Sequence, residues 1–222
     1  SFTGLAAGTY TYNVSDANGC TASCSVTITE PAALVATCSV VANVSCNGGT
    51  DGAADVTASG GTAPYTGTGS FTGLAAGSYT YNISDANGCT ASCSVTITEP
   101  AALVATCSVV SNVTCNGGTD GAADVTASGG TAPYTGTGSF TGLAAGSYTY
   151  NVSDANGCAA SCSVTITEPA ALVATCSVVS NVSCNGGTDG AADVTASGGT
   201  APYTGTGSFT GLAAGTYTYN VS

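Results

Sequence analysis

The cysteines are the side chains of this chain whose type and spacing best suit chemistry. There are twelve cysteines in 222 residues. Two sets of four share one spacing, namely Cys38, Cys46, Cys89 and Cys93, then Cys107, Cys115, Cys158 and Cys162. An even number of cysteines at fixed spacing indicates a disulfide framework made in an oxidising compartment. A structural zinc site is disfavoured, because the chain has no histidine and its short spacing is C-x3-C.

Four cysteines allow three pairings, so the sequence alone gives only a preference. We favour Cys46–Cys89 together with Cys38–Cys93, and the equivalent pairs in the second set. These bridges would staple the first strand of each domain to its last strand. A bridge that closes so long a loop adds about 4 kcal/mol of stability in the chain-entropy model. The rival pairing Cys24–Cys38 would join two neighbouring domains, and it stays open.

The elements that carry these cysteines recur in tandem. The string SFTGLAAG begins at Ser1, Ser70, Ser139 and Ser208, which gives a period of 69 residues. We therefore expect a window from a longer array. Its predicted parts are the C-terminal part of a repeat (1–30), two complete repeats (31–99 and 100–168) and the N-terminal part of a repeat (169–222). A short Thr-Glu-Pro joint separates them, which favours domains stacked into an elongated rod or fibre.

Within the complete repeat 31–99 the pattern predicts only β-strands. The expected strands, six or seven in number, include 33–44, 53–59, 63–65, 71–74, 78–84 and 92–98. Residues 78–84 and 92–98 alternate apolar and polar side chains, and the Asn87-Gly88 pair between them is typical of a hairpin turn with positive φ angles. No helical period appears. The predicted fold class is therefore all-β, with one small disulfide-stapled β-sandwich per repeat.

So short a sandwich has little core. We expect Phe71, Tyr79, Tyr81, Val95, Ile97 and Val40 to fill it. Tyr79 stands where a tyrosine corner would lie, and Tyr65 is a candidate for an exposed, adhesive aromatic side chain.

Charge excludes several partners. The chain has no Lys, Arg or His, and its twelve Asp and Glu residues give a net charge of −12. Nucleic-acid binding needs clustered Lys and Arg, and anionic membrane surfaces attract basic segments. We therefore expect neither nucleic acid nor membrane insertion in this segment, and we note that no run of about 20 apolar residues is present.

Catalysis is disfavoured for the same reason. A serine or threonine nucleophile needs a neighbouring base, and neither His nor Lys is available. The carboxylates Asp51 and Asp55 are four residues apart, but enzymes rarely copy a site in tandem. We expect no cofactor. Calcium is the one candidate ion, because Asp85, Asn87 and the segment 47–51 supply oxygen ligands, although turn-forming residues explain both segments better.

Sugar attachment is the strongest modification signal. The N-x-S/T acceptor pattern occurs at Asn13, Asn43, Asn82, Asn112, Asn151, Asn181 and Asn220. Thr66 and Thr68 lie in a Thr-Gly-Thr-Gly-Ser segment that is suited to O-linked sugar. A chain so rich in Asn, Ser and Thr also contains such patterns by chance.

Two segments resemble a known repeat. Residues 73–100 are GLAAGSYTYNISDANGCTASCSVTITEP, and residues 112–134 are NVTCNGGTDGAADVTASGGTAPY. Together they resemble the SprB-type repeat of Bacteroidota cell-surface proteins. The resemblance implies an immunoglobulin-like β-sandwich, repeated many times in long secreted adhesins, some of which serve gliding motility, and no catalysis. It also implies that Cys46 and Cys89 are the usual half-cystines of the family, with Cys38 and Cys93 as additions. The tryptophan that often follows the Pro-Tyr pair is replaced by Thr66.

Three functions remain to be compared. A structural component of an extracellular fibre or cell-surface stalk, which contacts copies of itself and carries attached glycans, fits near-identical repeats best. An adhesin whose repeats bind glycans or surfaces would need exposed aromatic side chains. An ice- or mineral-binding array would need a flat threonine face. Strand donation between chains is a further hypothesis for assembly, and a continuous chain is simpler.

Overall fold

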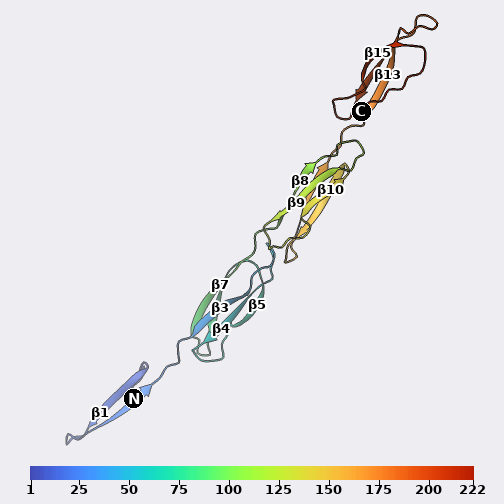
Figure 1. Ribbon diagram of the computed structural model, residues 1–222. Coiled ribbons are helices and arrows are strands. Elements are labelled where there is room, and N and C mark those ends of the chain that lie inside the picture. The colour runs from blue at the N-terminus through green and yellow to red at the C-terminus, as the bar shows by residue number, and fades with distance from the viewer. The chain divides into compact units, whose positions relative to one another are not determined.

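The chain folds entirely into β-structure. A computed structural model describes residues 1–222 and contains fifteen strands and no helix, and so no helix that could span a membrane. The chain divides into two compact units, Ser1–Pro100 and Ala101–Ser222 (Figure 1). Each unit is described by itself.

The first unit begins with a hairpin and continues with a complete repeat. The hairpin pairs β1 (Gly8–Ser15) with β2 (Thr21–Ile28). The complete repeat contains β3 (Val35–Ala42), β4 (Gly52–Ser59), β5 (Gly69–Leu74), β6 (Gly77–Ser84) and β7 (Thr90–Ile97). One antiparallel sheet has the order β3-β4-β5, and β6-β7 forms a second sheet. The two sheets pack as a small sandwich, with β3 against β7.

The second unit repeats this architecture and then part of it. Its complete repeat contains β8 (Val104–Ser111), β9 (Gly121–Ser128), β10 (Gly138–Leu143), β11 (Gly146–Ser153) and β12 (Ala159–Ile166). Its last sheet contains β13 (Val173–Ser180), β14 (Gly190–Ser197) and β15 (Gly207–Leu212). The predicted all-β class is confirmed, with two antiparallel sheets per complete repeat.

The core of the complete repeat lies between its two sheets. Val44, Ala54, Val95 and Ile97 are buried there, and Tyr79, Tyr81, Leu74 and Cys38 pack around them half-buried. The Phe71 and Tyr81 rings contact each other at an interplanar angle of 37°, with ring centroids 4.3 Å apart. Val40, which we expected inside, is 43% exposed. The reason is that β3 is an edge strand of its sheet, which leaves Val40 open to solvent although it lies opposite the buried Ala54. A β-bulge follows between Val40 and Ala42, and beyond it Val44 enters the core.

Two further strand-level predictions are wrong. Each complete repeat has five strands rather than six or seven, because residues 63–65 form a loop that contains a cis peptide bond before Pro64. In the turn after β6 only Gly88 has a positive φ, 83°, and Asn87 does not. The turn closes with a hydrogen bond from the Gly88 amide to the Asp85 carbonyl, 3.0 Å long, so a single glycine suffices.

The tyrosines have structural roles. The Tyr79 hydroxyl donates to the Ala75 carbonyl at 3.0 Å, which is the tyrosine corner that the sequence suggests. The Tyr65 hydroxyl donates to the Gly60 carbonyl at 2.6 Å, and its ring is half-buried. Tyr65 is therefore a loop anchor rather than an exposed adhesive side chain.

Candidate functional site

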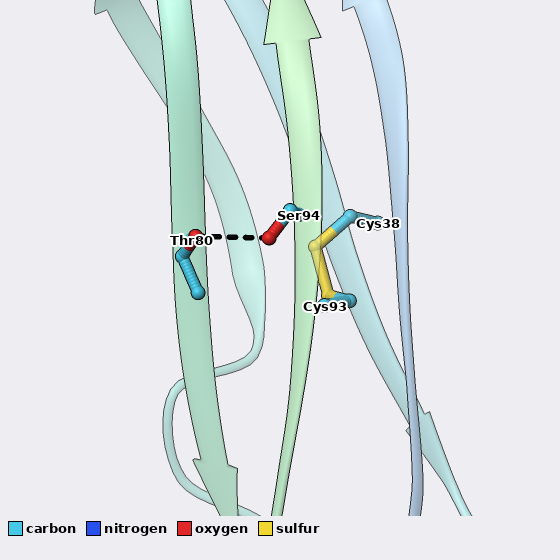
Figure 2. The surroundings of a disulfide bond; sticks show 4 residues. All are labelled: Cys38, Thr80, Cys93 and Ser94. Atoms are coloured by element: carbon cyan, nitrogen blue, oxygen red, sulfur yellow. Dashed lines mark hydrogen bonds between the residues drawn. A yellow bond between two sulfur atoms is a disulfide. The ribbon is translucent and has the colours of Figure 1, made fainter.

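One disulfide holds the two sheets of each complete repeat together. Cys38 and Cys93 are each the fourth residue of their strands, β3 and β7, and they form a disulfide with a Cα–Cα distance of 5.6 Å (Figure 2). Cys107 and Cys162 form the equivalent bridge in the second unit, also at 5.6 Å. These are two of the bridges that we favoured. The rival Cys24–Cys38 pairing is excluded, because Cys38 is bound to Cys93.

Polar pairs lie on the outer face of the same strands. In Figure 2 the Thr80 and Ser94 hydroxyls share a hydrogen bond of 2.9 Å beside the bridge, on the neighbouring strands β6 and β7. Ser78 and Thr96 make a similar pair at 3.1 Å. The hairpin thus has cysteine and apolar side chains on its inner face and hydroxyl pairs on its outer face, as its alternation predicts.

The structure does not form the Cys46–Cys89 bridge. Cys89 has a free, exposed thiol, whereas Cys46 is disulfide-bonded. In the second unit Cys115 is free and Cys158 is bonded. Cys46 and Cys89 lie at opposite ends of the repeat. The spacing of the cysteines does not reveal this separation, because spacing does not show in which direction each strand runs.

The first of these ends, here called the entry end, is where the chain enters the repeat. The Gly61 amide donates to the Ala32 carbonyl at 2.6 Å. The next residue, Thr62, donates its amide to the Asp85 carboxylate at 2.9 Å. The same carboxylate accepts the Cys89 amide at 2.8 Å. The Asp85 carboxylate therefore connects Cys89 to Thr62, and the neighbouring Gly61 binds Ala32 near the start of the repeat.

The other end, here called the exit end, is where the chain leaves. The loop after β3 contains Cys46, and its next two residues bind the departing chain. The Asn47 side-chain amide donates to the Glu99 carboxylate and to the Pro100 carbonyl, both at 3.1 Å. The Gly48 amide donates to the Glu99 carboxylate at 2.6 Å. Strand β7, whose eight residues span about 26 Å, separates this loop from Cys89, far more than the 7 Å limit between the Cα atoms of a disulfide.

Glu99 and Asn47 are functional residues that the sequence analysis missed. The signal was available, since a Glu-Pro pair recurs at every joint and an Asn-Gly-Gly segment follows each exit-end cysteine. In the second unit the Asn116 side chain donates to the Pro169 carbonyl at 3.1 Å, and the Gly117 amide donates to Glu168 at 2.6 Å. In both complete repeats the departing chain is therefore held by equivalent residues of the exit-end loop, an Asn side chain and the amide of the Gly that follows it.

One carboxylate at each end of the repeat, Asp85 at the entry end and Asp51 at the exit end, accepts hydrogen bonds from the loops. The Thr62 amide, followed by the Cys89 and Asn87 amides, hydrogen bonds to Asp85 and holds the pKa of this buried carboxyl below its usual value, although burial acts in the opposite direction. At the exit end, the hydroxyl and then the amide of Ser45 lower the pKa of Asp51. Both groups are carboxylates at neutral pH and act as acceptors for the loops.

The side chains that the sequence suggested for catalysis or calcium binding make hydrogen bonds within the repeat. Both oxygens of Asp85 accept backbone amides, and Asp51 accepts from Ser45. Asp55, the second member of the carboxylate pair, accepts the Ser70 hydroxyl at 2.8 Å. The Asn87 side chain donates to the Thr62 hydroxyl at 2.9 Å. No group of three or more His, Cys, Asp and Glu side chains is arranged to hold a metal ion.

The candidate sugar-acceptor residues are all exposed, and glycosylation stays a prediction. The residues are Asn43, Asn82, Asn112, Asn151, Asn181, Thr66 and Thr68. Asn43 and Asn112 each use the side-chain oxygen to accept a backbone amide, from Thr98 and Thr167.

The comparison with known families gives one match, which recurs with the repeat. The SprB repeat model matches residues 38–66, 107–135 and 176–204. Each matched segment runs from the fourth residue of the first strand, through the exit-end loop and the second strand, to the loop of Tyr65 and its equivalents. No curated protein matches the chain.

Proposed function

Because the chain carries three SprB repeats, a family of surface-associated repeat proteins, we propose that it is a structural component of an extracellular fibre or cell-surface stalk. In this proposal the repeats act as a passive spacer, stacked along a rod, and the partners are further copies of the repeat and attached glycans. The observation that carries the proposal is that two consecutive residues of a joint are hydrogen-bonded, one to the preceding repeat and one to the following repeat.

The joint within the second unit has no unbound residue. The Pro169 carbonyl accepts the Asn116 side chain of the complete repeat. The next carbonyl, that of Ala170, accepts the Gly199 amide of the following sheet at 2.7 Å. One peptide bond therefore separates the last residue held by one repeat from the first residue held by the next. A linker without free residues restricts bending, and restricted bending is what a spacer requires.

Composition supports an extracellular spacer. Without Lys or Arg the chain offers no site to trypsin-like proteases. One disulfide per complete repeat adds stability that so small a core cannot supply alone; in the repeat 31–99 that core has six buried apolar residues, Val44, Ala54, Val56, Ile83, Val95 and Ile97. The net charge of −12 makes the chains repel one another and so disfavours aggregation of the hydroxyl-rich surface.

An adhesin is the second candidate, and one surface feature favours it. Val35 and Val41 of β3 are 51% and 64% exposed, and their equivalents on β8, Val104 and Val110, are 50% and 60% exposed. Exposed valines that recur at the same positions in each complete repeat are candidate contact residues. The aromatic side chains of the complete repeats do not support adhesion, because they are half-buried within the fold.

The two candidates differ in how length depends on the number of repeats. Chains of two, four and eight repeats should be measured by small-angle X-ray scattering, together with electron microscopy of the native protein. A spacer predicts a maximum dimension that grows in proportion to repeat number. Growth with roughly the square root of repeat number contradicts the spacer. An adhesin predicts saturable binding to glycan arrays that Val41→Ser weakens.

A further inference from the structure

The repeat 31–99 contains two Asn-Gly pairs, one at each of its ends. They are Asn47-Gly48 at the exit end and Asn87-Gly88 at the entry end. All four residues are exposed, and both glycines have positive φ angles, 75° at Gly48 and 83° at Gly88. The two pairs are therefore matched in sequence, exposure and backbone conformation, and they differ in the atoms that surround them.

The main difference is the group that the glycine amide binds. The Gly48 amide donates to a carboxylate oxygen, Glu99 Oε2, at 2.6 Å. The Gly88 amide donates to the main-chain carbonyl of Asp85 at 3.0 Å. A carboxylate can act as a general base and take the proton of its donor, whereas a peptide carbonyl is far too weak a base. Of the two pairs, the exit-end pair therefore has a base in contact with the nitrogen of its glycine.

The same carboxylate also contacts the asparagine side chain. Asn47 Nδ2 donates to Glu99 Oε1 at 3.1 Å, and it also donates to the Pro100 carbonyl. The two oxygens of Glu99 thus contact the main-chain nitrogen of Gly48 and the side-chain nitrogen of Asn47. When an asparagine cyclises onto the residue that follows it, the first of these nitrogens attacks and the second one leaves.

We infer that the exit end is a self-catalysed deamidation site, at which Glu99 promotes the cyclisation of Asn47 onto Gly48. The Gly48 nitrogen gives its proton to Glu99 and bonds to Cγ of Asn47, which closes an imide ring. The bond between Cγ and Nδ2 breaks, and Nδ2 leaves as ammonia with the proton that Glu99 returns. Water then opens the imide and leaves an aspartate or isoaspartate at position 47. The net reaction is the hydrolysis of one side-chain amide, and Glu99 is regenerated.

The local structure favours both steps. Gly48 has no side chain that would crowd its nitrogen during ring closure. Its hydrogen bond to Glu99 holds this nitrogen beside the base before the reaction starts. Asn47, Gly48 and Glu99 are all exposed, so water reaches the imide and ammonia can leave.

The product holds the departing chain less firmly than asparagine does. An aspartate or isoaspartate lacks the Nδ2 donor, so both hydrogen bonds of Asn47, to Glu99 and to the Pro100 carbonyl, are lost. The new carboxylate also lies beside that of Glu99, and two negative charges so close together repel each other. The inference goes beyond the proposed spacer function and does not depend on it, since the reaction needs only one folded repeat.

Incubation of the native protein at neutral pH tests the inference, because small differences between the repeats identify each site. Ala42 marks the peptide of Asn47, and Ile83 marks the peptide of Asn87. Samples taken over time are reduced, cut with chymotrypsin and analysed by mass spectrometry for deamidated peptides. Asn47 is expected to deamidate about 100-fold faster than Asn87 in the folded protein, and at the same rate in the reduced protein in urea. Equal rates in the folded protein, or a faster Asn87, overturn the inference.

A variant tests the role of the base directly. Glu99→Gln removes the base but keeps a side chain of the same length, so deamidation at Asn47 should slow by about 100-fold. An unchanged rate at Asn87 shows that the repeat stays folded. Glu30→Gln is the matched control, because it makes the same change in the equivalent Thr-Glu-Pro segment, and it should leave the rate at Asn47 unchanged. An unchanged or faster rate at Asn47 in Glu99→Gln overturns the inference, since Glu99 would then only restrain the loop.

The second complete repeat allows the same test at an equivalent site. There the Gly117 amide, which follows Asn116, donates to Glu168 at 2.6 Å. Glu168→Gln should therefore slow deamidation at Asn116 by a similar factor. A rate at Asn116 that does not fall in this variant also overturns the inference.

Discussion

The hairpins β1–β2 and β6–β7 have nearly the same sequence and the same pairing, yet only the second belongs to a sandwich. Tyr10 faces Val26 in the first, and Tyr79 faces Val95 in the second. Val26 is 44% exposed, whereas Val95 is 8% exposed. The hairpin and its register are therefore encoded locally, whereas burial comes only when a three-stranded sheet covers the inner face.

The same comparison holds for the cysteines. Cys24 occupies in β2 the position that Cys93 occupies in β7, and each faces a tyrosine across the hairpin. Cys24 is free, and Cys93 is bonded to Cys38 of the opposite sheet. The bridge therefore depends on a three-stranded sheet that packs against the hairpin and supplies the cysteine of its first strand.

The largest expected effect comes from removing the bridge between sheets. Cys38→Ala combined with Cys93→Ala should lower the unfolding free energy of that repeat by about 4 kcal/mol, because a long loop in the unfolded chain is no longer closed. Hydrogen exchange of the β6–β7 amides measures this loss. Cys24→Ala is the matched control and should change nothing. Equal effects of both variants would show that the comparison between hairpins is wrong.

The next effect concerns the core. Ile97 is 1% exposed, and Ile97→Ala should cost about 3 kcal/mol through lost burial and a residual cavity. Ile28, its equivalent in the first hairpin, is only half-buried, so Ile28→Ala should leave urea denaturation of the complete repeats unchanged. Equal shifts in the urea midpoint would mean that the first hairpin also packs into a core.

The entry end predicts a dependence on acid. The pKa of Asp85 is lower in the folded state than its ordinary value of 3.8, so Asp85 stabilises the fold above that value. This stability is lost as the pH falls through the lowered folded pKa. Urea midpoints measured from pH 7 to pH 2 should therefore fall in the acid range.

Asp85→Asn should flatten that acid-range fall. Asp16→Asn should not, because Asp16 accepts only amides of its own turn. An unchanged profile in Asp85→Asn would remove Asp85 as the cause.

The smallest expected effect is that of the tyrosine corner. Tyr79→Phe removes the hydrogen bond to the Ala75 carbonyl and should lower the stability of the repeat by about 1 kcal/mol. Tyr10 makes the same bond to Ala6 at 2.9 Å in the first hairpin, where no sandwich depends on it. Thermal unfolding of the two variants should therefore differ, with a lower midpoint for the complete repeat only in Tyr79→Phe.

Sequence alternation was sufficient to predict the β6–β7 hairpin, the inward cysteine and the outward hydroxyl pairs. It failed at Val40, because β3 is the edge strand of its sheet and leaves this side chain open to solvent. It also failed for residues 63–65, where β-forming residues lie in a loop. Both errors depend on where a segment lies in the fold, which a two-residue period cannot reveal.

By itself the sequence determined the repeat, the all-β class, the local hairpins and the absence of cationic side chains, because each of these depends on neighbours along the chain. Only the tertiary structure decided that Cys38 meets Cys93, that Cys46 and Cys89 lie at opposite ends, and that the loop after β3 holds Glu99 of the departing chain. These facts depend on the directions in which β3 and β7 run and on which loops share an end. Contacts between residues more than 50 positions apart are set by how the two sheets pack, and no local pattern records that.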